Sequence, residues 1–181
     1  MGHVYDVIII GAGPGGCAAA RTLASAGFSV GLFDKAIFPR DKICGDALIP
    51  DAHQALKKLG LMERITNISC PAKGMRLTSF DGSNVLIRAD SACVPRLKLD
   101  ELLLDSTMEA GSEFLPGHEF VGISDESEEN YHVVFYRSGN HVPARAHWVL
   151  LATGANVRPI QRAGLLLRAE CRKFRDSPVC A

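Results

Sequence analysis

YDVIIIGAGPGGCAAARTLASAGFSVGLFD, residues 5–34, contains a strand, a glycine turn, a helix and a second strand. The run from Tyr5 to Ile10 is apolar and rich in β-branched residues, which is typical of a buried parallel strand. The Ala-rich residues 17–27 predict a helix that ends at Gly27. Residues 28–33 predict the second strand. The stretch therefore predicts one right-handed βαβ unit.

The glycine turn between the first strand and the helix has the spacing of a dinucleotide-binding loop. Gly11 permits the tight turn, Gly13 lets the backbone approach a pyrophosphate, and Gly16 lets the helix pack close to the strand. Pro14 fits the first helical turn, and the unpaired N–H groups of that turn attract phosphate. We therefore predict that the turn binds a cofactor through these three glycines, Pro14 and Gly15. The alternative is a glycine-rich turn that binds nothing.

An acidic residue, Asp34, ends the second strand, and Lys35 follows it; both belong to the predicted cofactor site. A carboxylate at this position accepts hydrogen bonds from ribose hydroxyls and repels a 2′-phosphate, so the nucleotide is expected to be an unphosphorylated adenosine. The turn alone does not separate FAD from NAD. After residues 36–50, however, the chain continues with a hairpin, a helix and a meander instead of further βα units. This organisation favours FAD.

The remaining elements are predicted from hydrophobic periodicity and turn residues. A helix is expected to begin at Asp51 as its capping residue. A hairpin over residues 75–88 turns at 81–83. A helix over 97–110 is closed by Gly111. The last strands are expected at 113–115, 118–123, 131–137 and 145–152, with Trp148 in the core.

Composition narrows the function classes. The chain has 181 residues, with 20 Lys and Arg against 20 Asp and Glu. This balance argues against nucleic-acid binding. No apolar run approaches the length of a membrane-spanning helix, and the N-terminus does not have a signal-peptide pattern, so a cytoplasmic location is expected. Peripheral membrane contact and the oligomeric state stay open. The six cysteines form no CxxC pair and no HExxH motif is present, so no metal site is predicted. Because GxSxG and P-loop motifs are also missing, the sequence does not indicate a serine hydrolase or an NTPase.

Three further segments carry a family resemblance. They read FPRDKICGDALIP (38–50), VPRLKLDELLLDSTMEAGSEF (94–114) and WVLLATGANV (148–157). Together with the glycine turn, they resemble the geranylgeranyl reductase-like flavoproteins, which are related to the aromatic-hydroxylase-type monooxygenases and halogenases. The resemblance implies an α/β, Rossmann-like FAD-binding domain of the glutathione-reductase type with an inserted β-hairpin and meander. It implies FAD as cofactor, NADH or NADPH as electron donor, and a small apolar substrate.

The resemblance also implies roles for particular residues. Arg96 is expected to reach the FAD near its pyrophosphate; the alternative is a surface arginine at a helix start. Cys44 and Gly45 are expected beside the flavin and the substrate channel. Cys44 is the only candidate for a catalytic residue, and the alternative is a buried thiol without chemistry. Val121 matches a position whose backbone reads the adenine edge, which is compatible with a core valine.

Two loop cations, Arg40 and Lys42, are interpreted as solvated charges, with an NAD(P)H-facing role as the alternative. Relatives are longer, and their second half carries a further GDAAG motif, for which Gly45-Asp46-Ala47 is in the wrong place. We therefore expect residues 1–159 to be an incomplete N-terminal FAD-binding domain and 160–181 to be a truncated continuation. The alternatives to a reductase module are part of a monooxygenase or halogenase, and a non-catalytic nucleotide-binding fragment.

Overall fold

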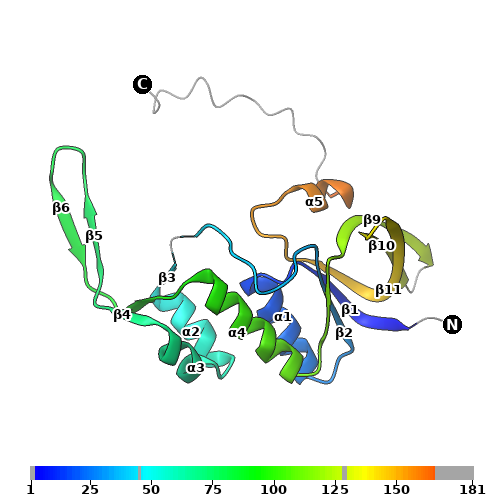
Figure 1. Cartoon of the computed structure of the whole chain (residues 1–181), viewed down its shortest axis with the longest axis horizontal. Coiled ribbons are helices and arrows are strands. Elements are labelled where there is room, and N and C mark those ends of the chain that lie inside the picture. Colours follow the sequence, from blue (N-terminus) through cyan, green and yellow to red (C-terminus); the bar gives the residue numbers. More distant parts are fainter. Residues whose placement is uncertain (1–2, 45, 128–129, 166–181) are drawn as a thin grey trace.

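A mixed six-stranded sheet is the centre of the protein in the computed structural model, which describes residues 3–44, 46–127 and 130–165 (Figure 1). The strand order is β8-β2-β1-β11-β10-β9. The first four strands in this order are parallel, and β10 and β9 continue the sheet in antiparallel fashion. The strands are β1 (Val4–Ile10), β2 (Val30–Asp34), β8 (Glu113–Pro116), β9 (Glu119–Ser127), β10 (Asn130–Arg137) and β11 (Asn140–Leu151).

The predicted βαβ unit is confirmed. Helix α1 (Pro14–Ser25) connects the parallel strands β1 and β2 and has Pro14 in its first turn. Its end is fixed by Gly27, whose φ of +91° is the left-handed conformation that glycine adopts without strain. The N–H of Phe28 then donates to the carbonyl of Leu23, which satisfies one of the last helical carbonyls.

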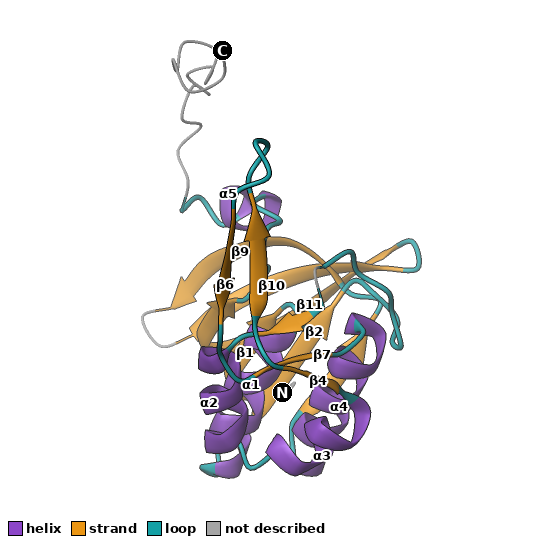
Figure 2. Cartoon of the chain, turned by 90° about the vertical axis from the view of Figure 1, so that its left-hand side faces the viewer, coloured by secondary structure: helices purple, strands orange, loops and turns teal. Residues whose placement is uncertain are grey.

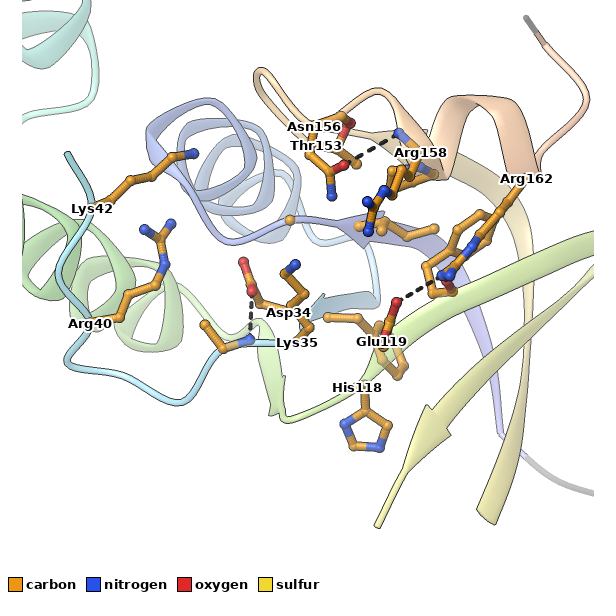
Figure 3. Close-up of a pocket in the computed structure, with 16 residues that line it drawn as sticks. Asp34, Lys35, Arg40, Lys42, His118, Glu119, Thr153, Asn156, Arg158 and Arg162 are labelled. Carbon is orange, nitrogen blue, oxygen red and sulfur yellow. Dashed lines mark hydrogen bonds and ion pairs between the residues drawn. The ribbon is translucent and has the colours of Figure 1, made fainter. Parts of the chain in front are cut away.

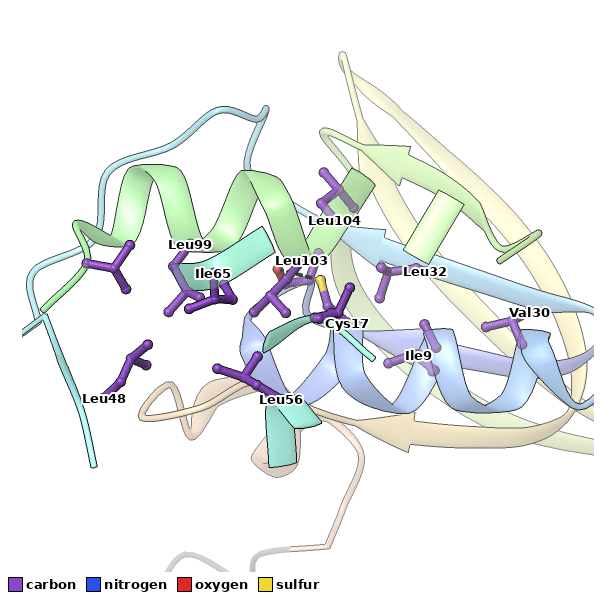
Figure 4. Close-up of a cluster of buried hydrophobic side chains, with 14 of the residues drawn as sticks. Ile9, Cys17, Val30, Leu32, Leu48, Leu56, Ile65, Leu99, Leu103 and Leu104 are labelled. Atoms are coloured by element: carbon purple, nitrogen blue, oxygen red, sulfur yellow. Dashed lines mark hydrogen bonds between the residues drawn. The ribbon is translucent and has the colours of Figure 1, made fainter. Parts of the chain in front are cut away.

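Helices cover one face of the sheet and bury a continuous apolar cluster (Figure 4). They are α1, α2 (Pro50–Lys58), α3 (Met62–Ile68) and α4 (Arg96–Glu109). Ile9 and Leu32 contribute to this cluster from the sheet, and Leu103 from α4. Thr107 of α4 donates a hydrogen bond of 3.2 Å to the carbonyl of Cys17, so α1 and α4 are joined by polar as well as apolar contacts.

The other face of the sheet has its own core, which the curled strands β9 and β10 close. Phe33 of β2 stacks on Phe135 of β10 with ring centroids 4.1 Å apart. Ile8, Phe120 and Val133 belong to the same buried cluster. Because both faces of β1 and β2 are buried, these strands are apolar without alternation.

A small second sheet extends from the helical layer, in the order β3-β7-β4 (Figure 2). It consists of β3 (Ala47–Leu48), β7 (Ser91–Cys93) and β4 (Cys70–Ala72). Between β4 and β7 the chain leaves as the hairpin β5 (Met75–Thr78) and β6 (Asn84–Ile87), which projects from the body of the protein (Figure 1). Every residue of both hairpin strands is exposed.

The fold class predicted from the sequence is confirmed, and three details differ. The helix expected to begin at Asp51 begins at Pro50 and is preceded by Ile49, so Asp51 lies inside its first turn. Helices α3 and α5 (Arg158–Arg162) and the small sheet were not predicted, because their segments are too short to show periodicity. Trp148 is 71% exposed instead of buried and belongs to neither apolar cluster.

Candidate functional site

A cleft of about 340 Å³ lies at the carboxyl ends of the parallel strands (Figure 3). This is where open α/β sheets bind ligands. It is lined by the ends of β1 and β2, the loop that follows β2, the start of β9, the turn after β11, and helix α5 (Arg158–Arg162). Of the predicted cofactor residues, Gly11, Asp34 and Lys35 line it.

Positive charge dominates this cleft. Its lining includes the five basic residues Lys35, Arg40, Lys42, Arg158 and Arg162, against the two acidic residues Asp34 and Glu119. Arg162 is paired with Glu119 at 2.9 Å and also donates to the carbonyl of Phe120, so α5 is held against β9. The excess of cations suits an anionic ligand such as a pyrophosphate.

Two glycines of the turn are required by the fold itself. A Cβ on Gly11, whose φ is +110°, would lie 2.5 Å from the carbonyl oxygen of Ala152 at the end of β11. A Cβ on Gly16 would lie 1.8 Å from the carbonyl oxygen of Gly11. The tight turn predicted at Gly11 and the close helix packing predicted at Gly16 are therefore confirmed.

The other two glycines of the turn have no such constraint. A Cβ on Gly13 would meet only Arg40, whose Nη2 is 3.8 Å away, and a Cβ on Gly15 would meet no atom within 4 Å. The φ of Gly13 is an ordinary −76°. Nothing in the protein thus demands a glycine at position 13, whereas a phosphate lying against the first turn of α1 would demand one. The turn fits the pyrophosphate of a dinucleotide.

Asp34 is held in place by two backbone donors. Its Oδ2 accepts from the N–H of Ala12 at 2.7 Å, and its Oδ1 accepts from the N–H of Ala36 at 2.8 Å (Figure 3 shows the second). A carboxylate can accept about four hydrogen bonds, so each oxygen keeps capacity for a further donor. The side chain is therefore oriented by the glycine turn and still able to accept from hydroxyl groups in the cleft.

A buried carboxylate joins two arginines beside the glycine turn. The Nε and Nη2 of Arg96 donate to the two oxygens of Asp100, each at 2.8 Å, and Arg40 lies 3.3 Å from the same carboxylate. The Asp100 side chain is fully buried. Its hydrogen bonds to Arg96 are the main cause of the raised pKa of that arginine, with a smaller contribution from Cys44. Arg96, whose side chain is 11% exposed, is thus a partly buried, paired residue and not a surface arginine.

The loop after β2 is likewise more ordered than the sequence indicated. The interpretation of Arg40 as a solvated charge is wrong: its side chain is 15% exposed, and its guanidinium lies 4.9 Å from the ring centroid of Phe38. Lys42 extends towards the turn after β11. Its Nζ lies 3.6 Å from the point that a Cβ on Gly154 would occupy. This loop and α4 thus both place cations beside the glycine turn.

The remaining predicted residues occupy different places. Cys44 is exposed and lies near Arg96, so it is not a buried thiol. Gly45 lies outside the described residues. Val121 is half-buried in β9, directly after the cleft residue Phe120, and does not itself line the cleft. The contacts of these residues with a cofactor stay predictions.

Sequence reasoning missed Asp100, Glu119, Arg158 and Arg162. Asp100 had a recognisable signal, because it follows Arg96 by four positions, the spacing at which side chains meet on one helix face. The others line the cleft only because α5 folds back over β9, a long-range contact that no local pattern reveals. In the described part of the chain no group of three His, Cys, Asp or Glu side chains could hold a metal ion. None of the described helices combines the length and apolar character needed to span a membrane.

Comparison with known proteins agrees with this geometry. A family model described as "FAD binding domain" matches residues 4–175. The menaquinone reductase of Mycolicibacterium smegmatis is 35% identical over 144 residues, which cover 76% of this chain and 35% of that protein. The digeranylgeranylglycerophospholipid reductase of Methanocella arvoryzae is 30% identical over 191 residues, covering 100% of this chain and 46% of that protein.

Among solved structures, the myxobacterial chondrochloren halogenase CndH, an FAD-dependent halogenase, superposes with a TM-score of 0.79 at 25% identity. The match covers 87% of this chain and 39% of the halogenase. The chain thus spans between about a third and a half of the length of these relatives.

Proposed function

This chain belongs to the family of FAD-binding domains of flavin-dependent oxidoreductases, and from that premise we propose that it is the FAD-binding portion of a reductase acting on a prenyl or other apolar substrate. In this proposal the ADP half of the cofactor occupies the cleft between β1, β2 and β9. The observation that carries it is the open space at Gly13, at the N-terminus of α1, beside a cleft rich in cations.

Several residues would hold the cofactor in this arrangement. The first turn of α1 and Arg40 lie where the pyrophosphate is expected, and Asp34 would accept from the ribose hydroxyls. Asp100 keeps Arg40 and Arg96 side by side, so that both guanidinium groups stay oriented before the ligand arrives. FAD, when bound, supplies the redox chemistry, and the protein binds, orients and tunes it.

The substrate class is inferred from the relatives. Menaquinone and digeranylgeranylglycerophospholipid, in the names of two of them, both carry long apolar chains. We extend this class to the present chain, with NADH or NADPH as the electron donor. The segment FPRDKICG, which carries Arg40 and Cys44, is the part of the sequence that favours the reductase branch. A cytoplasmic location, with peripheral contact to a membrane that holds the substrate, is part of the same proposal.

A second candidate is a portion of a flavin-dependent halogenase or monooxygenase. The superposition on CndH favours it, since that enzyme is a halogenase of the same fold. The two candidates share the FAD site and differ in what reacts with the flavin. Product analysis of a longer protein containing this domain, with an isoprenoid quinone or with halide and oxygen, separates them.

FAD binding by the 181-residue chain is the direct test. The purified protein is titrated with FAD, and bound flavin is read from its absorption bands at about 375 and 450 nm and from its fluorescence. Gly13→Val is the decisive variant, because it adds a side chain at the first turn of α1 whose Cβ would meet no protein atom within 4 Å other than Nη2 of Arg40. We expect this variant to lose FAD binding and to keep the melting temperature of the unmodified protein. Unchanged affinity in a folded Gly13→Val protein would contradict the proposed site.

Coupled turnover is a separate question, because the chain spans less than half of its relatives. Positioning of the reacting groups can lower an activation barrier by roughly 7–11 kcal/mol, and a site that lacks part of its residues loses much of this effect. We therefore expect FAD binding by this chain without NADH or NADPH oxidation above that of free FAD, followed at 340 nm. Sustained protein-dependent oxidation would show that these residues suffice for catalysis.

A further inference from the structure

Two cysteines face each other across the small sheet. Cys70 of β4 and Cys93 of β7 are direct partners in the antiparallel register, and the neighbouring pairs are Pro71 with Ala92 and Ala72 with Ser91. Residues opposed in this way project their side chains to the same face of the sheet. Both cysteines are exposed, whereas Ala92, which precedes Cys93 in β7, is buried in the apolar cluster under the helices. The two thiols therefore share one solvent-facing surface.

The spacing of such a pair suits a disulfide. Directly opposed residues in an antiparallel pair have Cα atoms about 4.5–5.5 Å apart, and disulfides accept about 4.4–6.8 Å. Their Cβ atoms, about 4.5–5.5 Å apart in a sheet, must approach to about 3.5–4.5 Å. β4 is an edge strand of only three residues and pairs with β7 alone, so it can make this small movement.

The position of the pair gives the bond a consequence. The strands β4 and β7, which carry Cys70 and Cys93, form the neck (residues 70–72 and 91–93) from which the β5–β6 hairpin projects (Figure 2). Just after Cys93, the N–H of Val94 donates to the carbonyl of Asp46 at 2.9 Å, and the N–H of Arg96 to its Oδ1 at 3.3 Å. A covalent link at the neck would therefore fix the hairpin to the strand that leads into α4.

We propose that Cys70 and Cys93 form a redox modification site that a hydroperoxide converts reversibly into a cross-strand disulfide. One thiolate attacks the peroxide, the O–O bond breaks, and the sulfur is oxidised to a sulfenic acid while the other oxygen leaves as water. The second thiolate attacks this sulfur, the S–S bond forms, and the S–O bond breaks with release of a second water. Two thiols and one hydrogen peroxide thus give one disulfide and two waters, and a dithiol reverses the reaction.

Peptide mapping tests the proposal on the full chain, without any cofactor. Each of the six cysteines lies in a different tryptic peptide; Cys70 is in residues 65–73 and Cys93 in residues 89–96. The reduced protein is treated with hydrogen peroxide, alkylated and digested. We expect a linked pair of these two peptides, with equal loss of alkylation at both cysteines, and recovery of both after dithiothreitol. The Cys44→Ser variant, which leaves the pair intact, should give the same linked peptide.

A second variant and an isotope experiment complete the test. In Cys70→Ser, Cys93 should accumulate as a sulfenic acid that dimedone traps, because its partner is missing. A mixture of light and ¹⁵N-labelled protein distinguishes links within one chain from links between chains. The proposal is overturned if the linked peptides are isotopic hybrids, if Cys93 links mainly to another cysteine, or if peroxide yields only sulfinic and sulfonic acids. None of these results depends on FAD binding, so they leave the proposed function untouched.

Discussion

Replacing Asp100 by asparagine removes the negative charge that Arg40 and Arg96 share. The substitution keeps the shape of the side chain but leaves both guanidinium groups without their counter-ion in a place where the carboxylate is fully buried. The side chain of Arg40 is 15% exposed and that of Arg96 is 11% exposed, so water compensates the lost ion pair only in part. Removing one partner of a buried ion pair costs about 3–5 kcal/mol.

We expect the introduced amide of Asp100→Asn to keep one hydrogen bond from Arg96, which places the loss of stability at the lower end, about 3 kcal/mol. For a chain of this size, that corresponds to a fall in melting temperature of roughly 6–12 °C. The assay is equilibrium urea unfolding followed by circular dichroism. Asp105→Asn is the matched control, because Asp105 is an exposed residue of the same helix, and it should change stability by no more than about 0.5 kcal/mol.

An Asp100→Asn protein that is as stable as the Asp105→Asn control and binds FAD with unchanged affinity would refute the idea that this carboxylate organises the two arginines. Loss of FAD affinity without loss of stability would give a different answer: the carboxylate would then matter only for the orientation of the arginines towards the ligand.

Three further results are expected. Gly16→Ala should destabilise the fold by about 3 kcal/mol or more, because its Cβ would lie 1.8 Å from the Gly11 carbonyl oxygen. In the control Gly15→Ala, where a Cβ meets no atom within 4 Å, the midpoint of urea unfolding should stay close to that of the unmodified protein. Burial raises the pKa of the Cys17 thiol to about 12, so the folded protein should resist iodoacetamide at Cys17 at pH 8. The protonated thiol stabilises the fold fully below the ordinary thiol pKa, and this contribution should be lost as pH rises towards 12; labelling of Cys17 in the native state would contradict the buried position. Finally, ADP should bind more tightly than 2′,5′-ADP in a titration, because Asp34 repels a 2′-phosphate. Asp34→Asn should reduce the difference in affinity between the two nucleotides. Equal affinities in the unmodified chain would mean that the attraction of the surrounding cations outweighs the repulsion by Asp34.

Local sequence signals predicted the strands, the glycine turn and the helix beside the cleft. The structure shows why glycine is needed at three of these positions. A Cβ on Gly11 or Gly16 would clash with a backbone carbonyl, and Gly11 and Gly27 have positive φ angles. The fold class followed from these elements in order. Long, periodic segments such as α4 were found within one residue of their ends.

Contacts between distant segments could not be predicted in this way. The packing of α5 on β9 brings Arg162 to Glu119, and the pairing of β4 with β7 brings Cys70 to Cys93. The sequences of these four segments contain no pattern that indicates which segments pack together. The burial of Arg40 has the same origin, since its solvated or paired state depends on Asp100, sixty positions further along the chain. Such residues become interpretable only when the sheet order is known.

The central position of β11 determines when the fold can be completed during synthesis. β1 pairs on one side with β2, which the ribosome delivers soon afterwards, but its other side pairs with β11, where Ile10 meets Leu151. Until residues 140–151 emerge, one edge of β1 is an open template for other strands. The carbonyl of Ala152, against which Gly11 packs, arrives at the same moment. The glycine turn is thus made long before β11 but reaches its final shape only after β11 has emerged, and a nascent chain that stalls before β11 exposes an apolar strand edge to its neighbours.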